Sequence, residues 1–199
     1  MLLKIPITIV SIRLLKRPTT IGQTTGMLHN MAEINKIFVD MDGVLADFEK
    51  GIELPMFLNG PFTNKDDYDS RKKELSDKGL FAALPLMPGM ELLVNYLKNT
   101  GIHWEILTAS GAINRPVVVR DKTIWVNKHI HPKPIVTSTL RGADKAVFAR
   151  PSHILIDDRK SNIDAWTKAG GIGILHTTAE NTIEELKSHG ISAIAQMTA

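Results

Sequence analysis

Short apolar runs bounded by turn residues recur along the chain and predict five β-strands. The runs lie at residues 37–39, 104–107, 134–137, 153–156 and 172–175. The stretches between them predict helices, at residues 91–98, 118–129, 145–149, 162–169 and 182–189. Strands that alternate with helices are typical of βαβ units. We therefore predict an α/β fold with a doubly wound, parallel, five-stranded sheet.

An insertion separates the first strand from the first of these helices. Residues 46–58 and 65–78 each predict a helix, although turn residues break the chain between them. We assign residues 33–47 and 87–199 to a core that contains the sheet. Residues 48–86 are assigned to a small helical cap inserted after the first strand.

Residues 1–32 form an N-terminal extension that contains no acidic residue. Its apolar opening is too short and too interrupted to span a bilayer, so we expect no membrane partner. Arginine and hydroxyl residues give it the composition of an organelle transit peptide. The alternative, which we favour, is a loosely attached segment, or a start codon at Met27 or Met31. We accordingly expect a cytoplasmic protein, with a mitochondrion or another organelle as the alternative.

Charge and cysteine content narrow the class of protein. The net charge is +3, but four of the 24 basic residues precede Glu33, the first acid, and the others are outnumbered by the 21 acidic residues. The body of the chain therefore lacks the basic excess typical of nucleic-acid-binding proteins, and we expect no stable nucleic-acid partner. The chain has no cysteine, which excludes disulfides, thiolate zinc sites and a cysteine nucleophile.

Side chains suited to phosphate chemistry follow four of the predicted strands. In chain order they are Asp40 and Asp42, Thr108 and Ser110, Lys145, and Asp157 and Asp158. Because residues i and i+2 of a strand point the same way, the first two acids can face one site. Ligands of open parallel sheets bind beyond the carboxyl ends of the strands. Carboxylates gathered there suit Mg²⁺, while a hydroxyl and an ammonium group would face phosphate oxygens.

The order of these residues resembles the haloacid dehalogenase-like phosphohydrolase superfamily over residues 35–176. Four motifs are similar to those of its 5′(3′)-deoxyribonucleotidase branch. They are Asp-Met-Asp-Gly-Val-Leu-Ala-Asp-Phe-Glu from Asp40, Leu-Pro-Leu-Met-Pro-Gly from Leu84, Ile-Trp-Val-Asn-Lys-His from Ile124 and Ile-Leu-Ile-Asp-Asp-Arg from Ile154. The resemblance implies a phosphatase for a small phosphorylated substrate, a nucleotide, and it allows a homodimer.

The resemblance also implies a role for each residue. Asp40 would attack phosphorus to form an aspartyl-phosphate, and Asp42 would protonate the leaving alkoxide and then activate water. The ligands of Mg²⁺ would be Asp40, the backbone carbonyl of Asp42, Asp157 and Asp158, and the sequence leaves open which of the last two binds the ion directly. The substrate phosphate would be bound by Thr108, Ala109, Ser110 and Lys145.

Two departures from the nucleotidase pattern concern the substrate. The branch places serine directly after threonine, whereas Ala109 separates Thr108 from Ser110 in this chain. It also carries Arg-Asp-Lys where this chain has Ala-Asp-Lys ending at Lys145, with Arg141 upstream. We expect these differences to affect the choice of substrate more than the chemistry.

The residues that flank the cap are candidates for recognition of the leaving group. Phe48 at its entrance and Phe81 at its exit are positioned to stack on a nucleobase, although burial between cap and sheet is the stronger interpretation for Phe81. A sugar phosphate and a 3′-phosphate at a nucleic-acid end are alternative substrates. A receiver-like signalling module and a catalytically inactive homologue are alternatives of a different class.

Overall fold

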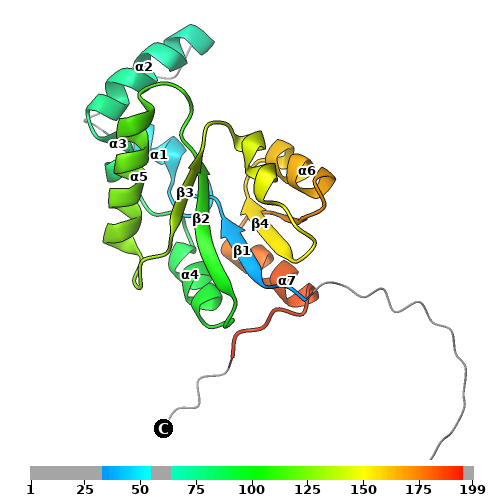
Figure 1. The fold of residues 1–199 in the computed structure, drawn as a ribbon. Coiled ribbons are helices and arrows are strands. Elements are labelled where there is room, and N and C mark those ends of the chain that lie inside the picture. The colour runs from blue at the N-terminus through cyan, green and yellow to red at the C-terminus, as the bar shows by residue number, and fades with distance from the viewer. Residues whose placement is uncertain (1–32, 55–63, 195–199) are drawn as a thin grey trace, which may run out of the picture. The chain divides into compact units, whose positions relative to one another are not determined.

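The computed structural model describes residues 33–54 and 64–194, and these residues contain a sheet of five parallel strands (Figure 1). The strands are β1 (Lys36–Val39), β2 (His103–Ala109), β3 (Val136–Thr139), β4 (His153–Asp157) and β5 (Ile172–Leu175). They lie in the order β3-β2-β1-β4-β5, and each neighbouring pair is parallel. The predicted parallel five-stranded sheet is thereby confirmed.

The strand order separates this fold from receiver-like modules. Strand β4 pairs with β1 from Lys36↔His153 to Val39↔Ile156. Receiver-like doubly wound sheets have the order 2-1-3-4-5, in which the third strand lies beside the first. Because β4 is the neighbour of β1 here, the receiver-like alternative is wrong. The carboxyl ends of β1 and β4 instead flank the crevice in which doubly wound sheets bind their ligands.

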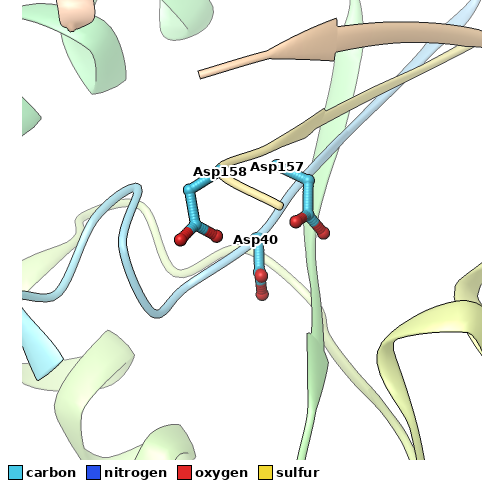
Figure 2. A group of neighbouring side chains, drawn as sticks. All are labelled: Asp40, Asp157 and Asp158. Atoms are coloured by element: carbon cyan, nitrogen blue, oxygen red, sulfur yellow. The ribbon is translucent and has the colours of Figure 1, made fainter. Parts of the chain in front are cut away.

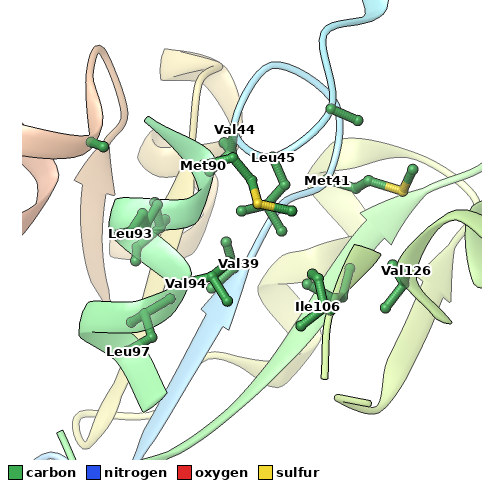
Figure 3. Packing of buried hydrophobic residues seen from close by; sticks show 14 of the residues in the cluster. Val39, Met41, Val44, Leu45, Met90, Leu93, Val94, Leu97, Ile106 and Val126 are labelled. Carbon is green, nitrogen blue, oxygen red and sulfur yellow. The ribbon is translucent and has the colours of Figure 1, made fainter. Parts of the chain in front are cut away.

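Helices cover both faces of the sheet, as a doubly wound fold requires. They are α4 (Met90–Lys98), α5 (Arg115–His129) and α7 (Ala179–Ser188) on one face, and the 3₁₀ helix η1 (Gly142–Phe148) and α6 (Lys160–Lys168) on the other. The period-two alternation of β1 places Ile37 and Val39 in the first core, and Phe38 in the second core with Trp166. Figure 3 shows part of the first core, built from side chains of β1, β2, α4 and α5.

Several elements begin or end at other residues than predicted. Strand β2 continues through Ala109, so Thr108 and Ala109 belong to the strand rather than to a turn after it. Strand β3 begins two residues later than predicted, because Pro134 has no N–H with which to join the ladder. Helix α5 begins three residues earlier than predicted, with Pro116 in its first turn.

The described part of the predicted cap contains three helices rather than two. They are α1 (Phe48–Ile52), α2 (Lys65–Asp77) and α3 (Leu80–Ala83). Helix α1 begins after Asp47, whose side chain accepts a hydrogen bond from the Lys50 N–H at 2.9 Å. Residues 55–58 of the predicted first helix lie outside the described residues. The single turn α3 was not predicted. It packs against α5 and buries Leu80 and Phe81.

Two antiparallel segments connect the predicted cap to the rest of the fold. The Asp47 N–H donates to the Pro85 carbonyl and the Met87 N–H donates to the Leu45 carbonyl, both at 2.9 Å. These hydrogen bonds hold the start and the end of the cap side by side, close to the predicted boundaries at residues 48 and 86.

Helix α2 is bound to the loop that follows β2. The Asn114 side-chain amide donates to Ser76 Oγ at 2.9 Å and to Asp77 Oδ1 at 2.7 Å. The Lys72 ammonium group donates to the Ser110 carbonyl at 3.1 Å. The cap thus carries a lysine to the carboxyl end of β2, where the predicted site lies.

A left-handed glycine allows the loop after β1 to pass the acidic residues of β4. Gly43 has φ 77°, and a Cβ atom on it would overlap the Asp158 carboxylate. We expect Gly43→Ala to lower the free energy of unfolding in urea by about 2–3 kcal/mol, from backbone strain and this overlap. Gly79 is the matched control, because it has φ 82° and no described atom within 4 Å of a Cβ. Gly79→Ala should cost about 1 kcal/mol, and equal losses would contradict the overlap at Gly43.

Among the described residues, none of the helices combines the length and the apolar character that a bilayer crossing needs. Residues 1–32, with the start codons considered at Met27 and Met31, lie outside the described residues. The interpretation of this extension therefore stays a prediction.

Candidate active site

Three carboxylates from two neighbouring strands meet at the carboxyl edge of the sheet. Asp40 follows β1, while Asp157 ends β4 and Asp158 follows it. Each offers one oxygen atom, and these atoms all lie within 4.8 Å of one another (Figure 2). Asp40 and Asp157 are buried, whereas Asp158 lies at the surface. The adjacency of β1 and β4 thus brings together acids that are more than a hundred residues apart in the sequence.

A buried lysine pairs with two of these acids. Lys145, in η1, is 1% exposed, and its Nζ atom lies 2.8 Å from Asp40 Oδ2 and 2.6 Å from Asp157 Oδ2. Burial works against its charge, but Asp40 and Asp157 outweigh burial and raise the pKa of Lys145. Burial likewise disfavours the Asp40 carboxylate, yet the charges of Lys145 and Lys122 hold the pKa of Asp40 below its ordinary value. Asp40 is therefore an ionised carboxylate, the form that a nucleophile requires.

The two acids of β4 have different surroundings. Both oxygens of Asp157 accept hydrogen bonds, from Lys145 Nζ at 2.6 Å, from Asn162 Nδ2 at 3.0 and 3.1 Å, and from the Arg159 N–H at 2.9 Å. The Asp158 carboxylate accepts no side-chain hydrogen bond from any described residue. Partial burial and the charges of Asp40 and Asp157 raise the pKa of Asp158 to about 6. The charge of Arg159 opposes this shift but offsets the repulsion at Asp158 only in part.

The acidic group fits a divalent cation. Its donors are hard carboxylate oxygens, which suit Mg²⁺, and the repulsion between Asp40 and Asp158 is what a bound dication would relieve. Because the oxygens of Asp157 are already occupied by hydrogen-bond donors, Asp158 is better placed than Asp157 to bind the ion directly. Asp157 instead orients Lys145 and Asn162.

The side chain of Asp42 faces a second buried lysine rather than the acidic group. Lys122 of α5 is 1% exposed, and its Nζ atom lies 2.7 Å from Asp42 Oδ2. Any contribution of Asp42 to metal binding is therefore left to its backbone carbonyl, as the resemblance implies. Lys122 was not predicted as a site residue. The sequence does contain a sign of this role. Lys122 lies on the same helix face as the apolar residues Val118, Trp125 and Val126, and a charged residue buried on such a face needs a partner of opposite charge.

The residues at the end of β2 differ in where their polar groups point. Thr108 Oγ1 accepts a hydrogen bond from Lys122 Nζ at 2.8 Å, and Thr108 and Ala109 line a cavity beside Asp40. The Ser110 hydroxyl is buried and donates to the Thr139 carbonyl at 3.1 Å. Ser110 is absent from the described residues that line this cavity. Strand β2 extends through Ala109, so the Ser110 hydroxyl meets the end of β3 instead of the predicted phosphate site.

Two cavities adjoin the acidic group. One, of about 500 Å³, is lined by Asp40, Asp42, Thr108 and Asn162, and by the cationic residues Lys72, Arg141 and Arg159. The other, of about 280 Å³, lies between the cap and the sheet edge and is lined by Phe48, Phe81 and Met87 beside Asp42 and Asp158. Asp42, Lys72, Ala109 and Arg159 line both cavities. The cation-lined and aromatic cavities are thus contiguous at Asp42.

The predicted aromatic pair lies in the smaller cavity. The rings of Phe48 and Phe81 are stacked, with centroids 5.9 Å apart and an interplanar angle of 24°. Phe48 is half-buried and Phe81 is 2% exposed. Phe81 therefore packs in the core, which is the interpretation that we favoured from the sequence. Phe48 is the residue of the pair whose ring is accessible.

A family model described as 5′ nucleotidase, deoxy (pyrimidine), cytosolic type C protein matches residues 59–198. The chain belongs to this family. The match begins after β1, so it includes Thr108, Lys145, Asp157 and Asp158 but not Asp40. Membership makes the protein a phosphatase of the 5′-nucleotidase type, against the alternative of a catalytically inactive homologue.

Relatives of this nucleotidase family member agree with that assignment. The human cytosolic 5′(3′)-deoxyribonucleotidase is 28% identical over 149 residues, which cover 65% of this chain and 73% of the human protein. A putative 5′(3′)-deoxyribonucleotidase of Vibrio phage KVP40 is 28% identical over 127 residues, which cover 63% and 67%. The predicted resemblance to this branch is confirmed.

Solved structures with a similar backbone trace include one whose title names a haloacid dehalogenase-like hydrolase and one whose title names a beta-phosphoglucomutase. A haloacid dehalogenase-like family hydrolase from Streptococcus pneumoniae has a TM-score of 0.49 and 16% identity, over 76% of this chain and 90% of that one. A putative beta-phosphoglucomutase from Thermotoga maritima has a TM-score of 0.46 and 17% identity, over 78% and 99%.

Proposed function

We propose that this phosphatase hydrolyses deoxynucleoside monophosphates, with Mg²⁺, through an aspartyl-phosphate on Asp40. The observation that carries the proposal is the position of Asp40. It is an ionised carboxylate held by Lys145, and it lines a cation-lined cavity that adjoins an aromatic cavity. A phosphate would occupy the first cavity and a nucleoside the second.

The reaction has two steps. In the first, an Asp40 oxygen attacks phosphorus, the bond from phosphorus to the leaving oxygen breaks, and the Asp42 carboxyl group gives that oxygen its proton. In the second, Asp42 takes a proton from water as the water oxygen attacks phosphorus, and the bond to Asp40 breaks to release inorganic phosphate. Thr108 and Lys145 would bind the phosphate oxygens. Mg²⁺, bound by Asp40, Asp158 and the Asp42 carbonyl, would screen the repulsion between carboxylate and phosphate.

The charges around the larger cavity support a dianionic substrate. Because Asp42 carries the leaving-group proton at the start of the first step, three carboxylates, Asp40, Asp157 and Asp158, oppose the two buried lysines, Lys122 and Lys145. One divalent cation would therefore give the group a net positive charge. Arg141 at the rim is paired with Asp144. Lys72 and Arg159 also line this cavity and add positive charge near the position of a phosphate monoester. The basic residues that the substrate needs are thus local, although the body of the chain has no basic excess.

The aromatic cavity favours a nucleotide over a sugar phosphate. Stacking on Phe48 would contribute to binding of any substrate with a base and nothing to a sugar without one. We expect Phe48→Ala to lower kcat/KM for deoxynucleoside monophosphates by about 10- to 100-fold, chiefly through KM, because stacking on one aromatic ring is worth ~1–3 kcal/mol. The value for deoxyribose 5-phosphate, measured in the same assay, should change little.

The same substrate panel tests the assignment itself. A wild-type protein that hydrolyses sugar phosphates or 3′-phosphorylated oligonucleotides as fast as deoxynucleoside monophosphates would contradict the nucleotide assignment. Equal losses on both substrates in Phe48→Ala would assign Phe48 to packing, as for Phe81.

The domain division and the compartment are further proposals. We propose that residues 48–86 act as the cap of a core formed by residues 33–47 and 87–199. The paired segments at Ala46 and Leu86 support this division, because the chain enters and leaves residues 48–86 side by side there. We also propose a cytoplasmic location, with a mitochondrion or another organelle as the alternative.

A further inference from the structure

The carboxylate of Asp42 depends on one group for its position. Oδ2 accepts a hydrogen bond from Lys122 Nζ at 2.7 Å. Oδ1 is buried, and in the part of the chain that the structure describes no donor reaches it. The side chain is 29% exposed and lines both cavities. Without Lys122, nothing described would hold this carboxylate in its present orientation.

The ammonium group of Lys122 is fully used. Its three N–H groups match three acceptors, Asp42 Oδ2 at 2.7 Å, Thr108 Oγ1 at 2.8 Å and the Ala109 carbonyl at 2.9 Å. The residue is 1% exposed, and its Nζ atom lies 5.4 Å from the centre of the Phe81 ring. Because all three N–H groups are used and the residue is buried, Lys122 is suited to holding other protein groups in place rather than to binding the substrate.

The contact with Thr108 also sets the direction of a proton. A threonine hydroxyl has one proton and two lone pairs. Because one lone pair accepts from Lys122, the Thr108 proton must point elsewhere, and it donates to no described residue. Thr108 lines the cavity that contains Asp40. The proton is therefore available to an oxygen of a bound phosphate.

We propose that Lys122 is a positioning residue that aligns the acid/base group Asp42 with the phosphate ligand Thr108. This inference rests on the proposed roles of Asp40 and Asp42. Lys122 fixes the distance and direction from Asp42 to the leaving oxygen, and it leaves the Thr108 proton for the phosphate. The proton that Asp42 gives to the leaving oxygen in the first step is regained from water in the second, so Lys122 stays protonated throughout.

A purely structural role would have a different kinetic signature. If Lys122 only neutralised a buried charge, its loss would slow the hydrolysis of every phosphate ester equally. If it aligns Asp42, the loss must depend on how much the leaving group needs a proton. A deoxynucleoside leaves as an alkoxide and needs one, whereas p-nitrophenolate leaves as a stable anion and needs none.

The experiment compares kcat/KM for a deoxynucleoside monophosphate and for p-nitrophenyl phosphate in Lys122→Met. We expect kcat/KM for the nucleotide to fall by about 1,000-fold, because both the alignment of Asp42 and the hydrogen bond to Thr108 are lost. The loss on p-nitrophenyl phosphate should be about tenfold, the value of one charged hydrogen bond to Thr108. Lys122→Arg keeps the charge and should recover part of the nucleotide activity. Lys128→Met, an exposed lysine of the same helix, is the matched control and should leave both values unchanged.

A second variant, Asp42→Asn, tests the proposed role of Asp42 separately from the inference about Lys122. The loss of kcat/KM in Asp42→Asn should again be larger for the nucleotide than for p-nitrophenyl phosphate. Adding Lys122→Met to Asp42→Asn should lower kcat/KM for the two substrates by similar factors. Equal losses on both substrates in Lys122→Met, with the expected difference in Asp42→Asn, would overturn the role of Lys122. The absence of that difference in Asp42→Asn would instead overturn the proposed role of Asp42. If Lys122→Met does not fold by circular dichroism, the same comparison is made with Lys122→Arg, where equal losses on both substrates again overturn the inference.

Discussion

Asp40→Asn is expected to abolish phosphate release from deoxynucleoside monophosphates while the protein stays folded. An amide cannot attack phosphorus as a carboxylate does, and loss of a nucleophile lowers kcat by at least about 10⁴-fold. The side chain has nearly the same volume, and Lys145 keeps its contact with Asp157, so the buried ion pair is not left without an acid. Phosphate release is measured under saturating substrate, and the fold is checked by circular dichroism.

Asp164→Asn is the matched control for this substitution. Asp164 lies in α6, where its side chain is 59% exposed and pairs with Lys160. Its replacement should leave turnover unchanged, because exposed ion pairs contribute little to stability. Turnover by Asp40→Asn within tenfold of the wild type would show that another group is the nucleophile.

Removal of divalent cations is expected to stop turnover and to lower the melting temperature. Asp40 and Asp158 repel each other at the sheet edge, and a dication bound to them stabilises only the folded state. Addition of Mg²⁺ after treatment with a chelator should restore both activity and thermal stability. Full turnover in the presence of chelator would contradict the metal requirement.

The same measurement distinguishes the two acids of β4. Asp158→Asn removes the acid that the described chain leaves unpaired, so it should raise the Mg²⁺ concentration for half-maximal activity by more than about tenfold and abolish the stabilisation by Mg²⁺. Asp157→Asn removes a partner of Lys145 and should lower stability even without metal. Identical effects of the two variants would contradict their separate roles.

The residues that the sequence predicts well are those placed by strand ends. Asp40, Asp157 and Lys145 gather because parallel strands expose their carboxyl ends at one edge, a rule that needs no knowledge of side-chain packing. The parallel sheet follows for a similar reason, since alternating strands and helices leave few topologies. The order of the strands was not predicted, because adjacency of β1 and β4 is a tertiary property.

The residues that the sequence did not predict depend on packing between elements. Lys122 lies in the middle of α5, and its role arises only when that face of the helix meets the end of β2. The difference between Asp157 and Asp158 likewise depends on which of them points at Lys145. The burial of the Ser110 hydroxyl follows from the length of β2, and strand ends are among the least reliable features of a sequence pattern.

The most direct test of the proposed reaction is to trap the phosphorylated enzyme. Wild-type protein and Asp42→Asn are mixed with a ³²P-labelled deoxynucleoside monophosphate, quenched in acid within milliseconds and digested for peptide mapping. We predict covalent phosphate on the peptide that contains Asp40 in the wild-type protein, with release at least as fast as turnover. Its formation should be slower in Asp42→Asn, because the first step then lacks the donor of the leaving-group proton. Turnover without covalent phosphate, or phosphate on a peptide without Asp40, would contradict the account.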